Sequence, residues 1–476
     1  MHSSLVVLGG GPGGYAAAFL AADLGMEVTL VESDPRLGGT CLLRGCIPSK
    51  ALLHVGKVIA EAREMSHWGV TYNAPAINVE TLRERKDKLI STLSGGLKML
   101  AKQRKVKVVH GRGVFEDSQT LYLKGEGVAA GDERLTFDHC VLAVGSIPTK
   151  VSAFDLPTDR VMDSTGGLEL KDIPESLLVV GGGYIGLELG SVYAELGTKV
   201  TVVELTSGLL PGADRDLVKP LHARLEKRFA AIHLDTKVAG MVDKKDSVEV
   251  KFQSAEGERS ERFSRVLVSI GRRPNSAGIG LDRTKVELDQ RGFVKVDNKG
   301  RTADPRILAI GDVAGEPMLA HKAAHEAKCA IEALHGEPAA FEPAGIPAIV
   351  FTDPEIAWVG LTEEQAAKAG RKVTVAKYPW AASGRAQALA RTEGLTKLII
   401  DPDTDRILGV GIVGAGAGDL IAEAGLAIEM GATARDMAET IHAHPTLGET
   451  LGFASEVHLG TATEIYKPKA KAKPTS

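Results

Sequence analysis

The segment LVVLGGGPGGYAAAFLAADLGMEVTLVE, residues 5–32, decides the fold because it recurs as LLVVGGGYIGLELGSVYAELGTKVTVVE at residues 177–204. Each copy has an apolar run, a glycine-rich turn, a stretch of helical length, a second apolar run and a closing Glu. Glu32 corresponds to Glu204, an offset of 172 residues. A single G-x-G-x-x-G turn is weak evidence, but two copies in one register predict two dinucleotide-binding domains.

Phosphate binding explains the residue types in both turns. The first glycine permits the tight turn, the second lets the backbone approach a pyrophosphate, and the third lets the helix lie close to the strand. The free N–H groups and the dipole at the helix start then attract the phosphates. The predicted cofactor-binding glycines of these turns are Gly9, Gly11, Gly14, Gly181, Gly183 and Gly186.

The two closing acids predict the choice of nucleotide. Glu32 and Glu204 are expected to accept hydrogen bonds from ribose hydroxyls. A carboxylate at Glu204 would repel the 2′-phosphate of NADP, and residues 205–207 place no Arg beside it. We therefore predict NAD, not NADP, at the second site.

Length and composition narrow the class of protein. A chain of 476 residues with net charge −4 predicts two to four domains and gives no reason to expect nucleic acid. Four cysteines do not make a disulfide-stapled secreted chain. No uncharged apolar run reaches the ~18 residues of a membrane span, and residues 5–26 lack the basic start of a signal peptide. We expect a cytoplasmic protein.

The second dinucleotide domain is expected to be an insertion within the first. Apolar runs end at Gly145 and at Gly271, and both glycines are predicted to contact cofactor where the chain crosses between domains. A buried strand predicted at 306–313 ends at Asp312, whose carboxylate can bond a polyol hydroxyl. After Pro343 the pattern changes to that of an α+β domain.

The expected domain boundaries are 1–147, 148–272, a central segment 273–344 that returns to the first domain, 345–466, and a disordered Lys-rich tail at 467–476. Residues 79–106 predict a charged helix with an inner leucine stripe. That stripe comprises Leu82, Leu89, Leu93, Leu97 and Leu100.

Two cysteines follow the first dinucleotide segment, in GTCLLRGCIPSK at residues 39–50. A dithiol beside a nucleotide cofactor can take two electrons from one partner and pass them to another. Two unpaired buried thiols are the plain alternative, and a zinc site would need a second Cys pair that the chain lacks.

Together the two glycine turns, the cysteine run, Gly311-Asp312 and HAHPTLGE at 442–449 resemble the flavin-dependent pyridine-nucleotide disulfide oxidoreductases, over nearly the whole chain. Within that family, GCIPSK at 45–50 is most similar to the branch that oxidises protein-bound dihydrolipoamide. The resemblance implies an α/β fold with two Rossmann-like dinucleotide-binding domains, the NAD domain inserted in the FAD domain, and a C-terminal α+β dimerisation domain. It also implies a homodimer and a lipoyl group carried by an acyltransferase or glycine-cleavage partner, with no nucleic acid and no membrane.

The same resemblance assigns the catalytic residues. Cys41 would be the interchange thiol and Cys46 the charge-transfer thiol against the flavin. His444 would be the acid/base, reaching in from the other subunit, with Glu449 orienting it. The five-residue step between them suits a turn that leads into a helix start. His442 is expected to be structural.

Two further positions follow from the family pattern. Lys50 matches the lysine near the flavin ring, with Glu188 as its carboxylate partner, and Asp312 matches the residue that bonds the ribitol chain. Without the family match, Lys50 and Glu188 would be a surface ion pair. Tyr184, in the second glycine turn, either covers the nicotinamide pocket or packs there.

The dithiol chemistry needs a thiolate. Cys46 lies just before a helix predicted to open near residues 49–53, and its dipole would favour the thiolate. The charge of Arg44, between the two cysteines, is predicted to lower the thiol pKa further.

The alternative function is an NAD(P)H-dependent reductase of another low-molecular-weight disulfide, similar to glutathione reductase. It predicts a preference for NADPH, which Glu204 disfavours. Relatives with an extra C-terminal redox pair are disfavoured because no Cys follows Cys329.

Overall fold

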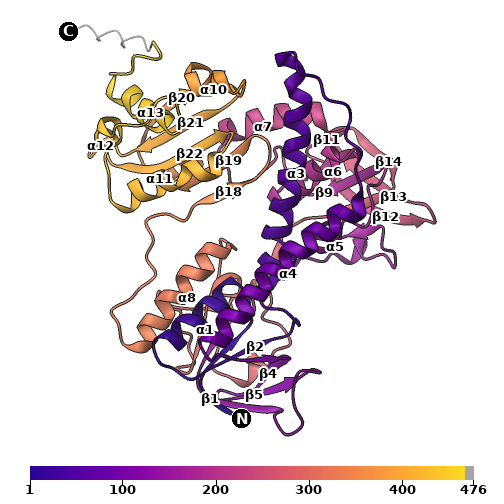
Figure 1. Ribbon diagram of the computed structural model, residues 1–476, viewed down its shortest axis with the longest axis vertical. Coiled ribbons are helices and arrows are strands. Elements are labelled where there is room, and N and C mark those ends of the chain that lie inside the picture. Colours follow the sequence, from indigo (N-terminus) through magenta and orange to yellow (C-terminus); the bar gives the residue numbers. More distant parts are fainter. Residues whose placement is uncertain (467–476) are drawn as a thin grey trace.

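A computed structural model describes residues 1–466 as three domains (Figure 1). The tail predicted to be disordered, 467–476, lies outside the described residues. Because the second domain interrupts the first, the chain forms the sheet of its first domain from segments on both sides of the insertion.

The first domain is built on a seven-stranded sheet whose parallel part carries the first glycine turn. Its order is β3 (Lys107–His110), β2 (Val28–Glu32), β1 (His2–Leu8), β6 (Arg134–Leu142), β5 (Thr120–Lys124) and β4 (Arg112–Asp117), with β17 (Ile307–Ala309) also pairing β6. The helices α1 (Pro12–Asp23) and α8 (Ala320–His335) pack together. Ala17, Ala18 and Ala21 are fully buried on α1, and these small side chains let the helix lie close to its neighbours.

The second domain repeats the parallel pattern. Its five-stranded sheet runs β11 (Ala231–His233), β10 (Lys199–Val203), β9 (Ser176–Val180), β15 (Arg265–Val268) and β8 (Val161–Met162), and every pairing is parallel. Its helices are α5 (Ser164–Glu169), α6 (Tyr184–Glu195) and α7 (Arg215–Arg228), and an antiparallel meander adds β12 (Lys237–Lys244), β13 (Ser247–Ser254) and β14 (Gly257–Phe263). Neither α7 nor this meander was predicted from the sequence.

The two crossings between these domains lie side by side. The short strand β7 (Ser146–Pro148) pairs antiparallel with β16 (Arg272–Pro274), so the chain leaves and re-enters the first domain at one place. Further on, β17 pairs with β6 and completes the first sheet. The predicted insertion of one dinucleotide domain within the other is confirmed.

The C-terminal domain is an antiparallel sheet covered by helices, as the α+β prediction requires. The strand order is β18 (Ala348–Val350), β19 (Glu355–Gly360), β22 (Ile407–Gly414), β21 (Leu395–Ile400) and β20 (Thr374–Pro379). Its helices are α9 (Glu363–Lys368), α10 (Gly384–Ala388), α11 (Ala417–Glu429), α12 (Ala434–Glu439) and α13 (Glu449–Leu459). The helix start expected at Glu449 is the first residue of α13.

Three helices join the domains. A short α2 (Gly39–Arg44) precedes the long α3 (Cys46–Glu64), which packs on α6 of the second domain (Figure 1). The longer α4 (Val79–Gln103) packs against α2 and α3. Among the described residues, no helix is long and apolar enough to span a bilayer.

The predicted rotation of α4 is wrong for three of the five stripe leucines, whereas Leu82 and Leu97 pack against buried apolar clusters as expected. The helix is present, but it buries Lys86, Ile90, Ser94 and Ala101, whereas Leu89, Leu93 and Leu100 are exposed. Two polar anchors set this rotation. The Lys86 ammonium donates to the Leu168 carbonyl at 2.8 Å, and the Ser94 hydroxyl donates to the Leu37 carbonyl at 2.8 Å.

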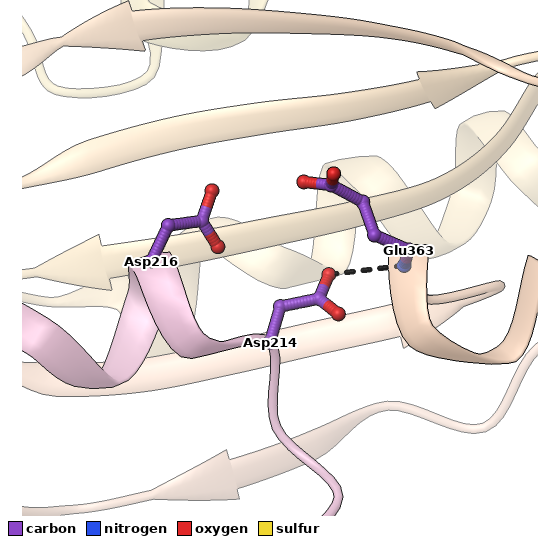
Figure 2. Close-up of side chains that lie close together, drawn as sticks. All are labelled: Asp214, Asp216 and Glu363. Atoms are coloured by element: carbon purple, nitrogen blue, oxygen red, sulfur yellow. Dashed lines mark hydrogen bonds between the residues drawn. The ribbon is translucent and has the colours of Figure 1, made fainter. Parts of the chain in front are cut away.

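A buried charge cluster joins the second domain to the C-terminal domain. The carboxylates of Asp214, Asp216 and Glu363 converge from the starts of α7 and α9 (Figure 2), with oxygens within 4.8 Å of one another. Such a trio could hold a metal ion, but the ammonium of Lys397 lies 2.6, 2.7 and 2.9 Å from the three carboxylates. Although burial opposes the charge, these hydrogen bonds raise the pKa of Lys397. The cation of this cluster is therefore a lysine from β21.

We expect Lys397→Met to lower the free energy of unfolding by about 3–5 kcal/mol, because it leaves the buried Asp214 carboxylate without its cation. Lys377 is the matched control, since it contacts Asp216 and Glu363 from a position where its side chain is 42% exposed. Lys377→Met should cost about 1 kcal/mol or less. Urea unfolding of both variants measures the difference, and equal losses would show that Lys397 does not hold the domains together.

Candidate active site

The first glycine turn has the geometry that a dinucleotide requires. Gly9 adopts φ +109°, and a Cβ on Gly14 would lie 1.8 Å from the Gly9 carbonyl oxygen, so these positions require glycine. A Cβ on Gly11 would instead face open space, with its nearest neighbour 3.7 Å away. That space lies at the start of α1, where the backbone N–H groups can hold a pyrophosphate.

The second turn repeats these features. Gly181 adopts φ +104°, and a Cβ on Gly186 would lie 2.4 Å from the Gly181 carbonyl oxygen. A Cβ on Gly183 would meet nothing within 4 Å. Both turns therefore leave room for a diphosphate at a helix N-terminus, and the residues present fit two dinucleotides.

The two acids also occupy equivalent positions. Glu32 accepts a hydrogen bond from the Gly10 N–H at 2.6 Å, and Glu204 accepts one from the Gly182 N–H at 2.6 Å. Each carboxylate therefore braces its own glycine turn with one oxygen, while the other oxygen accepts from a backbone N–H two residues on, that of Asp34 or Thr206.

The dithiol lies in a cavity of about 520 Å³ beside the first turn. Its lining brings together residues that are far apart in the chain, including most of the predicted flavin-site positions. They are Gly9, Gly11, Glu32, Cys41, Cys46, Lys50, Gly145, Tyr184, Glu188 and Asp312. A groove of about 1680 Å³ on the other side of Tyr184 is lined by Gly181, Gly183, Glu204 and Gly271. Tyr184 lines both spaces, so a gating role fits its position.

The two thiols differ in proton affinity. Cys46 is the first residue of α3, while Cys41 lies in α2. A hydrogen bond from Cys41, assisted by the nearby Lys50 ammonium against the effect of burial, lowers the pKa of Cys46 to about 7. The same hydrogen bond, together with burial, raises the pKa of the Cys41 thiol. Cys46 is thus the thiolate of the pair and Cys41 keeps the proton.

The structure does not support the predicted role of Arg44. Its guanidinium is paired with Asp34, and the cation that lowers the pKa of Cys46 is Lys50. The sequence placed Arg44 close to both cysteines along the chain, but the side chain turns to the acid that follows β2.

We expect the reduced dithiol to titrate with an apparent pKa of about 7 at Cys46. Lys50→Met removes a positive charge that favours the thiolate, so the midpoint should move to higher pH. The absorbance of the Cys46 thiolate measures both midpoints. An unchanged midpoint in Lys50→Met would show that Lys50 does not act on this thiol.

Lys50 is held in place by two elements besides its own helix. Its ammonium lies 2.8 Å from the Glu188 carboxylate on α6 and 4.5 Å from the centre of the Phe351 ring. Glu188 is only 4% exposed and also accepts from the Phe351 N–H at 3.0 Å. This pair, with a buried carboxylate and a half-buried ammonium, lies at the meeting point of three domains, and no sequence pattern pointed to Phe351.

Asp312 is linked to both domain crossings. Its carboxylate accepts from the Ser146 hydroxyl at 2.6 Å, and that hydroxyl accepts from Arg272 Nε at 2.8 Å. Sequence reasoning did not identify Ser146 or Arg272 as site residues. Because they come from β7 and β16, only the pairing of those strands could have found them.

The predicted acid/base pair forms in the C-terminal domain. His444 Nδ1 lies 2.8 Å from a Glu449 oxygen, and the other Glu449 oxygen accepts from the Thr446 N–H at 2.7 Å. The His444 side chain is 77% exposed and does not line the dithiol cavity of the same chain. The dyad therefore presents His444 Nε2 outward, where it can serve a site formed with another subunit.

Comparison with known proteins agrees with this division of the chain into dinucleotide-binding domains and a C-terminal domain. Residues 3–327 match the family model described as pyridine nucleotide-disulphide oxidoreductase, and residues 346–454 match the dimerisation domain of the same family. The chain belongs to the pyridine nucleotide-disulphide oxidoreductase family.

Particular relatives are similar over their full length. The chain is 47% identical over 474 residues to a dihydrolipoyl dehydrogenase from Vibrio parahaemolyticus, covering 99% of each chain, and 42% identical to one from Bacillus subtilis, covering 98% of each. Among solved structures, LpdA from Mycobacterium tuberculosis superposes with a TM-score of 0.87 at 28% identity, covering 95% of this chain and 98% of that one. The flavoprotein disulfide reductase RclA from Escherichia coli, solved as a Cu(II) complex, gives 0.84 at 26%, covering 96% and 99%.

Proposed function

We propose that this protein is a dihydrolipoyl dehydrogenase, which oxidises protein-bound dihydrolipoamide to lipoamide with NAD⁺ as acceptor. The observation that carries the proposal is the cavity shared by the first dinucleotide turn and the Cys41–Cys46 pair. The full-length similarity to curated dihydrolipoyl dehydrogenases supports the same reaction.

The two cofactors are FAD at the first turn and NAD at the second. Gly9, Gly11, Gly14 and Glu32 would hold the FAD nucleotide, with Gly145, Lys50 and Asp312 along the rest of the cavity. Gly181, Gly183, Gly186, Glu204 and Gly271 would hold NAD. Bound FAD supplies the two-electron chemistry that connects the dithiol with NAD⁺.

The thiol exchange follows from the unequal proton affinities of the cysteines. His444 takes the proton of one dihydrolipoamide thiol, and the resulting thiolate attacks Cys41 in the Cys41–Cys46 disulfide. Cys46 leaves as a thiolate, which its lowered pKa favours. The second substrate thiol then attacks the substrate sulfur of the mixed disulfide, which forms the lipoamide S–S bond and breaks the bond to Cys41, and the departing Cys41 sulfur takes up the proton of that second thiol. The substrate loses two electrons and the dithiol gains them.

The assembly follows from the position of the dyad. We infer a homodimer built by the C-terminal domain, in which His444 of each subunit serves the dithiol of the other. The acyltransferase or glycine-cleavage partner would bring the lipoyl group to this composite site. A cytoplasmic location fits an enzyme that works on such complexes.

The test is steady-state oxidation of dihydrolipoamide by the purified holoenzyme, with NAD⁺ and NADP⁺ in parallel. We expect turnover with NAD⁺ and a long-wavelength absorbance band from the Cys46 thiolate against the flavin. If the band appears but dihydrolipoamide is not oxidised, the substrate would be another low-molecular-weight disulfide. Faster turnover with NADP⁺ would contradict the role given to Glu204.

A further inference from the structure

We propose that His442 is a positioning residue for dihydrolipoamide oxidation, because its imidazole clamps the loop that carries His444 between α11 and α13. The inference rests on the proposed function, in which His444 is the acid/base. It goes further by naming what holds that acid/base in place.

The ring of His442 has partners at both nitrogens. Nε2 lies 2.7 Å from a Glu423 oxygen on α11, and Nδ1 lies 2.9 Å from the carbonyl oxygen of Thr440, which ends α12. The His442 side chain is 12% exposed, whereas that of His444, two residues on, is 77% exposed. One histidine of the pair anchors to the domain and the other projects from it.

Both partners of the ring are acceptors. A backbone carbonyl oxygen can only accept, so Nδ1 donates to Thr440, and Nε2 faces the Glu423 carboxylate. A hydrogen bond to a carboxylate is charge-assisted. Such bonds contribute more than neutral ones, so the contact with α11 is a strong constraint on the loop.

The third contact of the ring is with α13. A Cβ on Gly452 would lie 3.1 Å from His442 Nδ1 and 3.3 Å from its Cε1, so glycine at this position lets the imidazole rest on the helix. Gly452 is three residues after Glu449 on the same helix, and Glu449 orients His444. The ring therefore touches the element that fixes the dyad.

The loop between these anchors is braced internally. The Thr446 hydroxyl donates to the Ala443 carbonyl at 2.7 Å, and the Thr446 N–H donates to Glu449. With His442 at its start and Glu449 at its end, the loop has two fixed ends and His444 lies between them. Removing the first anchor leaves the His444–Glu449 bond intact but frees the loop to shift.

We expect His442→Phe to lower kcat for dihydrolipoamide by about 10–100-fold, since a displacement of about 1 Å at a reacting group costs on that scale. An aromatic ring is kept, but neither hydrogen bond can form. Glu423→Gln should lower kcat in the same direction by a smaller factor, because it removes the charge and keeps an acceptor. The KM for NAD⁺ should not change in either variant.

The matched control is His458→Phe. His458 lies on α13, the helix that carries Glu449, but near its C-terminal end. Its side chain is 13% exposed, and its Nε2 lies 2.9 Å from an Asp405 oxygen. We expect the kcat of the His458→Phe variant for dihydrolipoamide to stay within about twofold of the parent value, as for a residue outside the catalytic unit. A merely structural role for His442 would make the two phenylalanine variants alike.

The discriminating readout is NADH oxidation with ferricyanide as acceptor. This reaction takes electrons from the reduced flavin without thiol exchange, so it needs no acid/base at His444. His442→Phe should retain it, together with the thiolate–flavin band and the dimer mass, while losing dihydrolipoamide turnover. Equal loss of both activities, or full dihydrolipoamide turnover, would overturn the inference.

Failure of the inference and of the proposed function can be told apart. If His444→Gln is inactive and His442→Phe is fully active, only the clamp is wrong. If His444→Gln is itself fully active, the acid/base assignment fails. If His442→Phe does not fold, the Glu423→Gln variant tests the clamp instead, because it leaves His442 in place and keeps the volume of the side chain at 423. A kcat equal to that of the parent in Glu423→Gln would then show that His442 is not a positioning residue.

Discussion

Replacing Cys46 by Ser is expected to lower dihydrolipoamide turnover by at least about a thousandfold, the scale on which removal of a catalytic nucleophile acts. The variant cannot form the Cys41–Cys46 disulfide, so it cannot accept electrons from a dithiol. It should also lose the long-wavelength band while keeping its flavin, because the thiolate with the pKa of about 7 is gone. Turnover and the visible spectrum of the purified variant measure both effects.

Cys41→Ser separates the two thiols. We expect equal loss of turnover, but retention of the band, because the serine hydroxyl can still donate to the Cys46 thiolate. Cys329→Ser is the matched control, because Cys329 is buried in α8, away from the dithiol. Dihydrolipoamide turnover by this variant should equal that of the parent. Loss of the band in Cys41→Ser and retention in Cys46→Ser would reverse the roles proposed for the cysteines.

Replacing His444 by Gln is expected to lower dihydrolipoamide turnover by about 10²–10⁴-fold, the usual contribution of a general acid/base. Thiol exchange needs a thiolate, and Gln cannot take the proton of the incoming thiol. The deficit should shrink as pH rises toward the ordinary thiol pKa of about 8.5, since the substrate then ionises without help. A pH series of kcat for parent and variant measures this, and a deficit independent of pH would contradict the role of base.

The matched variant for this test is Glu449→Gln, which keeps the side-chain volume and an acceptor near His444. It should show a smaller loss with the same pH trend, because the carboxylate orients the ring. NADH oxidation by ferricyanide should be unaffected in both variants.

Residue spacing predicted the elements that depend on local chemistry. A glycine turn needs positive φ at Gly9 and Gly181, and this requirement is visible in the residue type alone. The His444–Glu449 pair was assigned from the family resemblance, and its five-residue spacing agreed, since both residues lie in one short loop and helix start. The orientation of α4 was not, because its buried face is set by hydrogen bonds from Lys86 and Ser94 to carbonyls in other elements.

The sequence by itself determined the duplicated α/β architecture, the family and the chemical types of the site residues. These depend on short-range patterns that recur at a fixed offset. Tertiary structure alone decided which groups meet each buried lysine: the Phe351 ring at Lys50, and the acids of α7 and α9 at Lys397. Such contacts join residues that are distant in the chain, so their identity depends on how the domains pack. Within the C-terminal domain, the packing of α11 and α13 likewise decided the contacts of the His442 ring with Glu423 and Gly452.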